Sequence, residues 1–300
     1  MRVPRDGVER GNVADLVRRA ATGDGADKPA LVWQDRSVSW AELDAEVDAT
    51  ARALRALDLP ESTGHPARVA IALPNVPDFA VAYFGVLRAG LVAVPINPGY
   101  TPRELRQVLT DSGASVLIGQ SAGTEDLAIP HRYATPPRAE GEPVEPPTGD
   151  EDLAILIYTS GTEGDPKGAM LSHRALLANH EQAAAVVPPP VSADDTLLLA
   201  VPLFHAYGLN SGLGAVAYHG ATGVLMERFD PAESLRLIAA HHVTVVIGVP
   251  PMFVAWSLLP ECGELFAPVR VAVCGAAPLN PAAAGRFLAA TGIRSSRGTG

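Results

Sequence analysis

The sequence predicts an α/β protein with parallel-rich sheets flanked by helices. Strand and helix signals alternate almost throughout its 300 residues. Short apolar runs rich in Val, Ala and Ile read as buried strands, and capping sequences precede the longer amphipathic segments. Repeated strand–helix alternation implies parallel strands joined by helical crossovers, with helices on both faces of each sheet.

In the first 120 residues, capped helices are expected between strands. The capping box Ser39-Trp-Ala-Glu42 precedes apolar residues on a helical period, and Thr101-Pro-Arg-Glu104 precedes a helix that ends at Gly113. Asn75 is expected to cap the helix between them, with Pro77 in its first turn. The strands expected here cover residues 69–73, 92–96 and 115–118.

The same alternation continues beyond residue 150. Ser172 is expected to start a helix that runs to about residue 187. Asp230-Pro-Ala-Glu233 caps another helix, and Asn280 with Pro281 opens the last one. The strands expected here cover residues 197–201, 243–249 and 269–273.

Residues 121–150 interrupt the pattern with acidic residues and with Pro130, Pro136, Pro137, Pro143, Pro146 and Pro147. This composition is not expected to pack and is typical of an exposed connector. The expected organisation is a first α/β region over residues 1–120, a connector over 121–150, and a second α/β region over 151–300. The two regions can still share one domain.

Composition excludes several classes of function. The net charge of −10 and the lack of any Lys/Arg run argue against nucleic-acid binding. Cys262 and Cys274 have no metal-ligand spacing, so no metal site formed by this chain is expected. Residues 79–96 are interrupted by Arg88 and Gly90 and are too mixed to span a bilayer. A cytoplasmic protein with no membrane segment is therefore expected.

The chemically most informative stretch is Tyr158-Thr-Ser-Gly-Thr-Glu-Gly-Asp-Pro-Lys-Gly168, which directly follows an apolar run. Hydroxyls and free amides on a glycine-rich turn suit phosphate oxygens, and Lys167 adds a point charge. A Walker loop does not fit, because Pro166 stands where its second glycine belongs. A polar surface turn would explain the composition but not the order.

This stretch resembles the signature of the adenylate-forming superfamily, which includes acyl-CoA synthetases, luciferases and peptide-synthetase adenylation domains. Only Glu163 departs from that signature. A carboxylate beside the triphosphate would be repelled by it unless the carboxylate helps to hold Mg²⁺. We expect the Glu163 carboxylate to point outward. The resemblance implies that the loop contacts the β- and γ-phosphates of ATP. The cofactor-binding residues expected here are Thr159, Ser160, Gly161, Thr162, Glu163, Gly164 and Lys167.

A second match is Val201-Pro-Leu-Phe-His-Ala-Tyr-Gly-Leu209. The resemblance implies that His205 lines the acyl site and shifts as the substrate enters, so Lys167 and His205 are the expected catalytic residues. Taken alone, His205 would more often be a packed core histidine. His173 also matches a family position, but helix capping by Ser172 explains that stretch equally well.

A third match is Val273-Cys-Gly-Ala-Ala-Pro-Leu279. Small residues at the carboxyl end of a strand leave room for a flat ring. The resemblance implies that Gly275, Ala276, Ala277 and Pro278 form one wall of the adenine site, and their sequence is most similar to fatty acyl-CoA ligases. Weaker agreement reaches Leu73-Pro-Asn75, so the resemblance covers nearly the whole chain.

The family's next motif, Gly-Tyr-Gly-x-Thr-Glu, supplies an adenine-stacking Tyr and a Mg²⁺-binding Glu. The chain ends instead in Ser-Ser-Arg-Gly-Thr-Gly300. Loss of one base near the codon for Ser295 would convert a family-like Val-Val-Gln-Gly-Tyr-Gly into these residues. The expectation is an N-terminal portion, truncated before the last subdomain and inactive by itself. The nucleotide sequence from Arg294 onward tests the frameshift hypothesis.

The resemblance implies a fatty-acid–CoA ligase that uses ATP, Mg²⁺ and CoA. A carboxylate is a poor acyl donor until it is joined to AMP with loss of pyrophosphate, so the protein's task is to align ATP with the acid and neutralise charge. Two alternatives remain open: an aryl-CoA ligase or peptide-synthetase adenylation domain, and a non-catalytic nucleotide-binding remnant.

Overall fold

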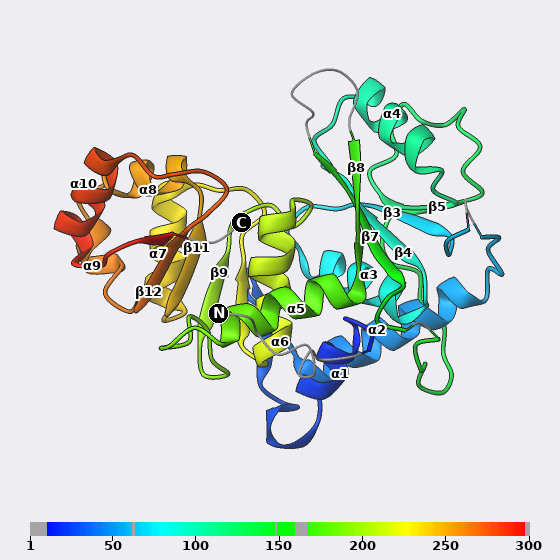
Figure 1. Cartoon of the computed structure of the whole chain (residues 1–300), viewed down its shortest axis with the longest axis horizontal. Coiled ribbons are helices and arrows are strands. Elements are labelled where there is room, and N and C mark those ends of the chain that lie inside the picture. Colours follow the sequence, from blue (N-terminus) through cyan, green and yellow to red (C-terminus); the bar gives the residue numbers. More distant parts are fainter. Residues whose placement is uncertain (1–10, 62–63, 148, 160–166, 298–300) are drawn as a thin grey trace.

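A computed structural model of the chain describes residues 11–61, 64–147, 149–159 and 167–297. Two mixed sheets flanked by helices form the described part (Figure 1). The strand orders are β6-β5-β3-β4-β7-β8 and β13-β12-β11-β9-β10-β1-β2. Antiparallel pairing occurs at one edge of each sheet, between β7 and β8 and between β1 and β2, and the other pairs are parallel. This confirms the predicted fold class.

Each sheet takes strands from both sides of residues 121–150. The first sheet contains β3 (Arg68–Ala72), β4 (Val92–Pro95), β5 (Val116–Gly119), β6 (His131–Tyr133), β7 (Leu153–Thr159) and β8 (Lys167–Ser172). The second contains β1 (Pro29–Trp33), β2 (Arg36–Ser39), β9 (Thr196–Leu199), β10 (Thr222–Leu225), β11 (Val245–Gly248), β12 (Val271–Cys274) and β13 (Ser296–Arg297). Residues 121–150 therefore divide the chain along its sequence, but each sheet contains strands from both sides of this segment.

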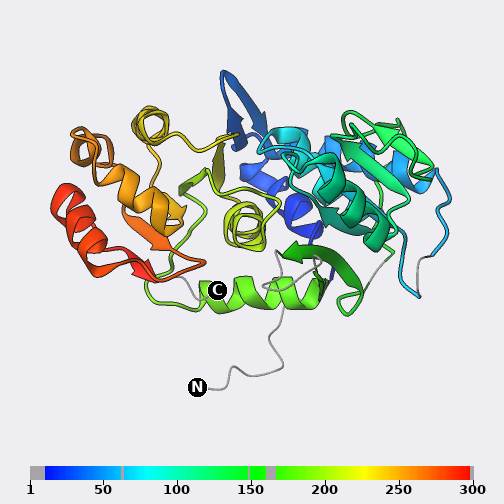
Figure 2. The ribbon, with the colours of Figure 1, turned by 90° about the horizontal axis from the view of Figure 1, so that it is seen from above.

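Helices cover both sheets, and α5 runs along one side of the molecule (Figure 2). The α-helices are α1 (Asp15–Ala20), α2 (Trp40–Arg55), α3 (Pro77–Arg88), α4 (Pro102–Ser112), α5 (His173–Ala184), α6 (Ala215–His219), α7 (Pro231–Ala240), α8 (Pro250–Trp256), α9 (Cys262–Leu265) and α10 (Pro281–Thr291). The short 3₁₀ turn η2 covers Gly23–Gly25, and η3 (Tyr207–Gly214) is π-helical. No helix among these described residues has the length and apolar character needed to cross a membrane.

The predicted capping signals at Ser39, Thr101 and Asp230 are confirmed. Each side chain accepts a hydrogen bond from the backbone amide three residues on, and at Ser39 and Thr101 the glutamate at that position bonds back. Such pairs involve only neighbouring residues, which is why a sequence pattern is enough to predict them. The helix after Ser172 ends at Ala184, three residues earlier than expected.

The largest hydrophobic core joins the two sheets. Val69 and Ile71 of β3 and Leu197 and Leu199 of β9 belong to the same buried cluster. Helix α3 lies within it and is buried around its whole circumference, as expected for a helix that is apolar on every side. The two sheets are thus held together by one continuous core.

The charged side chain of Arg88 lies at the C-terminal end of this buried helix. The guanidinium of Arg88 has no exposed surface and contacts Asp44 at 2.6 Å and Asp48 at 2.9 Å. It also donates to the carbonyl oxygen of Ala14 at 3.1 Å. Because a buried charge is tolerated only when paired and hydrogen-bonded, these contacts make α1, α2 and α3 interdependent.

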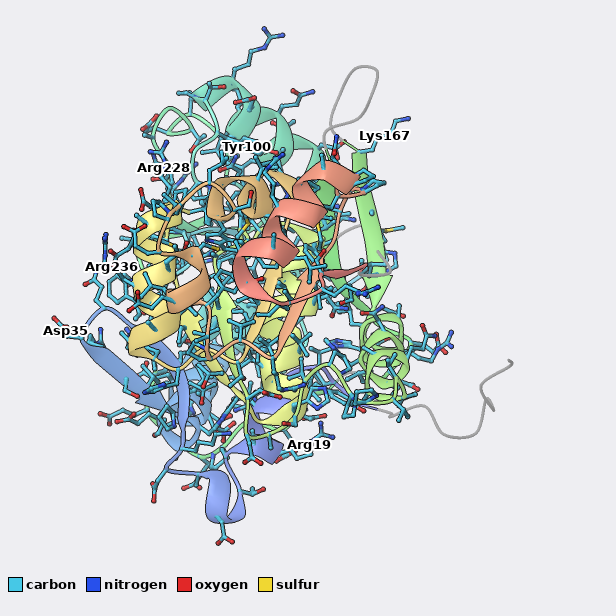
Figure 3. The ribbon with its side chains drawn as sticks, turned by 90° about the vertical axis from the view of Figure 1, so that its left-hand side faces the viewer. Arg19, Asp35, Tyr100, Lys167, Arg228 and Arg236 are labelled. Carbon is cyan, nitrogen blue, oxygen red and sulfur yellow. The ribbon has the colours of Figure 1, made fainter. Side chains whose placement is uncertain are left out.

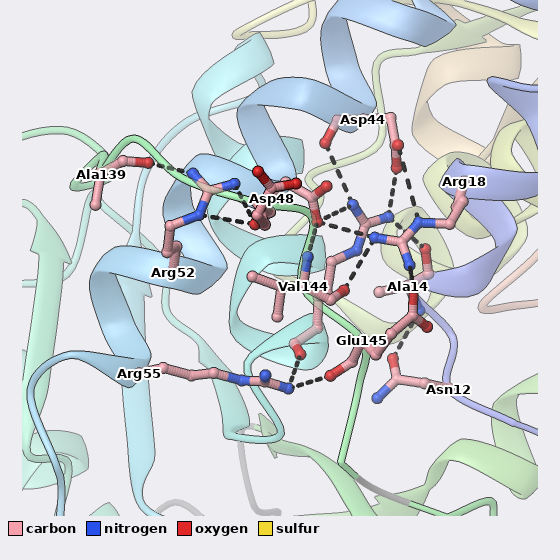
Figure 4. Close-up of polar contacts among 12 residues, drawn as sticks. Asn12, Ala14, Arg18, Asp44, Asp48, Arg52, Arg55, Ala139, Val144 and Glu145 are labelled. Carbon is pink, nitrogen blue, oxygen red and sulfur yellow. Dashed lines mark hydrogen bonds and ion pairs between the residues drawn. The ribbon is translucent and has the colours of Figure 1, made fainter.

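Residues 121–150 are packed more closely than their composition predicts. They contain strand β6, and the side chain of Val144 is buried. Arginines of α1 and α2 hold the segment by its backbone. Arg18 donates to the carbonyl of Val144 at 2.9 Å (Figure 4). Arg52 donates to the carbonyl of Glu142 at 2.8 Å. Most described side chains of this segment are exposed or half-buried, as expected for a connector, and these two arginines attach its backbone to α1 and α2.

Candidate active site

The phosphate-loop signature lies on the β7–β8 hairpin of the first sheet. Thr159 pairs with Lys167 and Tyr158 with Gly168 at its loop end. Lys167 is the exposed first residue of β8 and lies at the edge of the molecule (Figure 3). The signature residues Ser160, Gly161, Thr162, Glu163 and Gly164 and the side chain of Thr159 lie outside the described residues.

Close packing at the stem of the hairpin holds the signature to α4. The hydroxyl of Tyr158 donates a hydrogen bond to Oδ2 of Asp111 at 2.5 Å, and burial together with this bond raises the pKa of Tyr158. A Cβ on Gly168 would lie 2.6 Å from Cδ1 of Leu156, so the leucine side chain would have to shift to admit a larger residue. The Tyr158 hydrogen bond is thus the directed contact that attaches the hairpin stem to α4.

The second signature follows β9 on the other sheet. His205 lies on a turn in which its amide donates to the carbonyl of Pro202 at 3.1 Å. Its ring is exposed and lies beside Phe204, with ring centroids 4.6 Å apart. Partial desolvation lowers the pKa of His205 below its usual range, which favours the neutral ring. The alternative of a packed core histidine is wrong, since that exposure excludes it.

The third signature follows β12 and contacts the second. Gly275 is buried directly against Tyr207, whose ring carbon Cζ would lie 2.3 Å from a Cβ at position 275. The hydroxyl of Tyr207 donates to the carbonyl of Val273 at 3.2 Å. Ala276, which has a φ of 62°, Ala277 and Pro278 are exposed at this strand end. The second and third signatures are thus in contact, whereas Lys167 lies on the other sheet.

A cavity of about 280 Å³ opens beside Tyr207. Its walls come from α5, η3, α6 and the strands β11 to β13, and include Asn179, His180, Tyr207, Ser211, Ile247 and Val273. Sequence reasoning missed this cavity, since α5 and η3 carry no motif of their own beyond Tyr207. The apolar strand residues form one side and the polar helix residues another.

Two histidines of α5 are buried, and one of them, His180, is part of the cavity wall. His180 stacks on Tyr218, with ring centroids 5.3 Å apart, and burial lowers its pKa to about 4. His173 accepts a hydrogen bond at Nδ1 from the amide of Val13 at 3.1 Å, and burial likewise lowers its pKa to about 4. His173 therefore fastens the N-terminal segment, while Ser172 caps α5 as expected.

The described residues can be compared with the needs of the two charged groups of an ATP complex, its phosphates and its Mg²⁺ ion. Lys167, exposed at the loop end of the β7–β8 hairpin, is suited to phosphate oxygens. Within the described ranges no group of three or more His, Cys, Asp or Glu side chains could hold a metal ion.

Comparisons with known proteins show the family to which the chain belongs. A family model described as "AMP-binding enzyme" matches residues 17–298. The chain belongs to the AMP-binding enzyme family. It is 35% identical over 260 residues to a feruloyl-CoA synthase of Amycolatopsis sp., covering 84% of this chain and 52% of the relative.

Other relatives act on different acids by name. A 4-coumarate–CoA ligase 3 of Oryza sativa subsp. japonica is 30% identical, covering 84% of this chain and 49% of the relative. A long-chain-fatty-acid–CoA ligase of Bacillus subtilis is 29% identical, covering 78% and 50%. The chain spans about half the length of the curated relatives it matches.

Solved structures of this family share the fold. ATP-bound MatB from Rhodopseudomonas palustris superposes with a TM-score of 0.84 and 27% identity, covering 96% of this chain and 60% of that one. An inhibitor-bound N-terminal domain of FACL13 from Mycobacterium tuberculosis gives 0.84 and 27%, covering 96% and 75%. The predicted family and its N-terminal domain fold are confirmed.

Proposed function

We propose that this chain carries the nucleotide and acid sites of an ATP-dependent acid–CoA ligase that activates a compact aromatic carboxylic acid. The observation that carries the proposal is the cavity of about 280 Å³ beside Tyr207, where the second and third signatures meet. This volume is near the lower end of the range of roughly 300–1,000 Å³ for small-molecule pockets, which suits a ring better than a long alkyl chain. Relatives named for feruloyl and 4-coumaroyl groups support the same choice.

Adenylation assigns a task to each signature. Lys167 and the adjoining loop bind the β- and γ-phosphates of ATP and neutralise the departing pyrophosphate. Gly275, Ala276, Ala277 and Pro278 form a wall for adenine. His205, two residues before Tyr207, is assigned to the carboxylate of the acid, although it does not itself line the cavity. A carboxylate oxygen attacks the α-phosphorus as the bond to the β-phosphate oxygen breaks, and the thiol of CoA then displaces AMP.

A fatty acid is the second candidate substrate. The Ala-Ala-Pro sequence at 276–278 and the relative from Bacillus subtilis favour it. A long chain would have to extend beyond the cavity, past Val186 at its rim or into solvent. The two candidates therefore predict different affinities for acyl-adenylate analogues.

Calorimetry with feruloyl- and palmitoyl-sulfamoyl adenosine, which replace the reactive phosphate by a sulfamate, tests the proposal. The feruloyl analogue should bind at least about tenfold more tightly, a difference of about 1.4 kcal/mol. Ser211→Phe, which fills the cavity, should weaken this analogue while leaving the affinity for ATP unchanged. Tighter binding of the palmitoyl analogue would favour the fatty acid, and binding of ATP alone would favour a nucleotide-binding remnant.

A further inference from the structure

The side chain of Asn75 joins the two sheets at the candidate active site. Asn75 lies three residues after β3 and is only 2% exposed. Asn75 does not cap α3 as the sequence pattern predicts. The N-cap residue is Val76, and no side-chain hydrogen bond caps the helix. The side chain instead turns away from the helix toward the second sheet.

The hydrogen bonds of this side chain reach the last residue of β9 and the loop that follows it. Nδ2 donates to the carbonyl oxygen of Leu199 at 3.1 Å and to that of Val201 at 3.0 Å. Oδ1 accepts from the amide of Leu203 at 2.8 Å. Both amide hydrogens and the oxygen are therefore used, and they hold the segment that continues β9 beyond its last residue.

That segment leads directly to His205. Leu203 is fully buried, and the turn closes two residues later through the bond from the His205 amide to Pro202. On the other side of Asn75, β3 pairs with β4, and β4 pairs with β7, the strand that ends in the phosphate-loop signature. Asn75 is thus the hydrogen-bonded link between the sheet that carries Lys167 and the turn that carries His205.

We propose that Asn75 is a positioning residue that fixes the His205 turn relative to the phosphate-binding sheet. The inference rests on the proposed function, because adenylation requires the acid and the α-phosphate to meet in line. A misplacement of about 1 Å can cost on the order of a hundredfold in such reactions. Packing of apolar side chains alone would allow the turn to slide, whereas three directed hydrogen bonds define its position.

Asn12 offers a matched control. It is also an asparagine that is 2% exposed, and its side chain donates to the carbonyl of Leu87 at 2.9 Å and accepts from the amide of Ala14 at 2.8 Å. These bonds hold the N-terminal segment against α3. Asn12→Ala should therefore lower stability by a comparable amount without moving the His205 turn.

Two measurements on the full chain compare Asn75→Ala with Asn12→Ala. In the first, hydrogen exchange at the amide of Leu203 should be at least about tenfold faster in Asn75→Ala than in Asn12→Ala under native conditions. In the second, the dissociation constant of feruloyl-sulfamoyl adenosine should rise about tenfold in Asn75→Ala, whereas that of ATP should change by less than about threefold. Asn75→Ser, whose shorter side chain has one hydroxyl that can still form a hydrogen bond, should give intermediate values and replaces Asn75→Ala if that variant does not fold.

The outcomes separate this inference from the proposed function. If the unchanged chain binds ATP but not the analogue, the proposed function fails, and the exchange rate at Leu203 alone decides the role of Asn75. If the analogue binds and both variants weaken it equally, or if both variants show the same exchange at Leu203, Asn75 is a structural residue and the inference is overturned.

Discussion

Replacing Gly275 by alanine tests the contact that unites two of the signatures. A Cβ at this position would lie 2.3 Å from Cζ and 2.7 Å from Oη of Tyr207. The ring must therefore withdraw by about 1.1 Å, the difference from a normal contact of 3.4 Å. Overpacking of this kind costs about 1–3 kcal/mol. Losing the bond from Tyr207 to the Val273 carbonyl adds about 1 kcal/mol.

We therefore expect Gly275→Ala to lower the free energy of unfolding by about 2–4 kcal/mol. Urea unfolding at neutral pH measures this change. Because the displaced ring lines the cavity, the same substitution should also weaken binding of feruloyl-sulfamoyl adenosine.

Two controls locate the effect in the Tyr207 contact. Gly285→Ala places a methyl group in open space on α10 and should raise stability by about 0.5–1 kcal/mol. In a Tyr207→Ala background, Gly275→Ala should cost less than about 0.5 kcal/mol. The reasoning would be refuted if Gly275→Ala still lowered stability by about 2–4 kcal/mol in the Tyr207→Ala background, or if it cost less than about 0.5 kcal/mol in the unchanged chain.

Three further predictions concern charge. Arg88→Met should lower the free energy of unfolding by about 3–5 kcal/mol in the same urea assay, because it leaves two carboxylates without their buried partner. The control Arg106→Gln breaks an exposed ion pair and should cost less than about 1 kcal/mol. Lys167→Ala should raise the dissociation constant of ATP about tenfold in calorimetry. The melting temperature should not change, because the side chain is exposed. An unchanged affinity for ATP would remove Lys167 from the phosphate site. The pKa values of His173 and His180, near 4 when folded against 6.5 when unfolded, make the unfolded chain bind more protons between these values. Stability should therefore be complete above pH 6.5 and fall by at most about 3 kcal/mol per histidine as the pH drops to 4, and His180→Leu should flatten that slope.

Features that depend on neighbouring residues were predictable from the sequence. The capping boxes at Ser39 and Thr101 are examples, because the donor and acceptor lie three residues apart. The three signatures indicated the family because their order matches along the chain. Helix α3 was also predicted, since Pro77 marks its first turn and Gly90 follows its end.

Features that depend on distant residues were not predictable. Asn75 has the sequence context of a helix cap, but its partners lie more than 120 residues away on the other sheet. The proline-rich segment 121–150 has the composition of an exposed connector, yet Arg18 and Arg52 donate hydrogen bonds to its carbonyl groups. The cavity forms only where α5, η3 and the second sheet meet, and no pattern within any one of them indicates it.

The most direct test of the account is a crystal structure of this chain with feruloyl-sulfamoyl adenosine. The account predicts that the aromatic ring lies in the cavity between Tyr207 and Ile247, with adenine against residues 275–278 and the sulfamate on the side of His205. An analogue whose ring lies outside this cavity, with Tyr207 and Gly275 undisturbed and the cavity empty, would contradict the central claim.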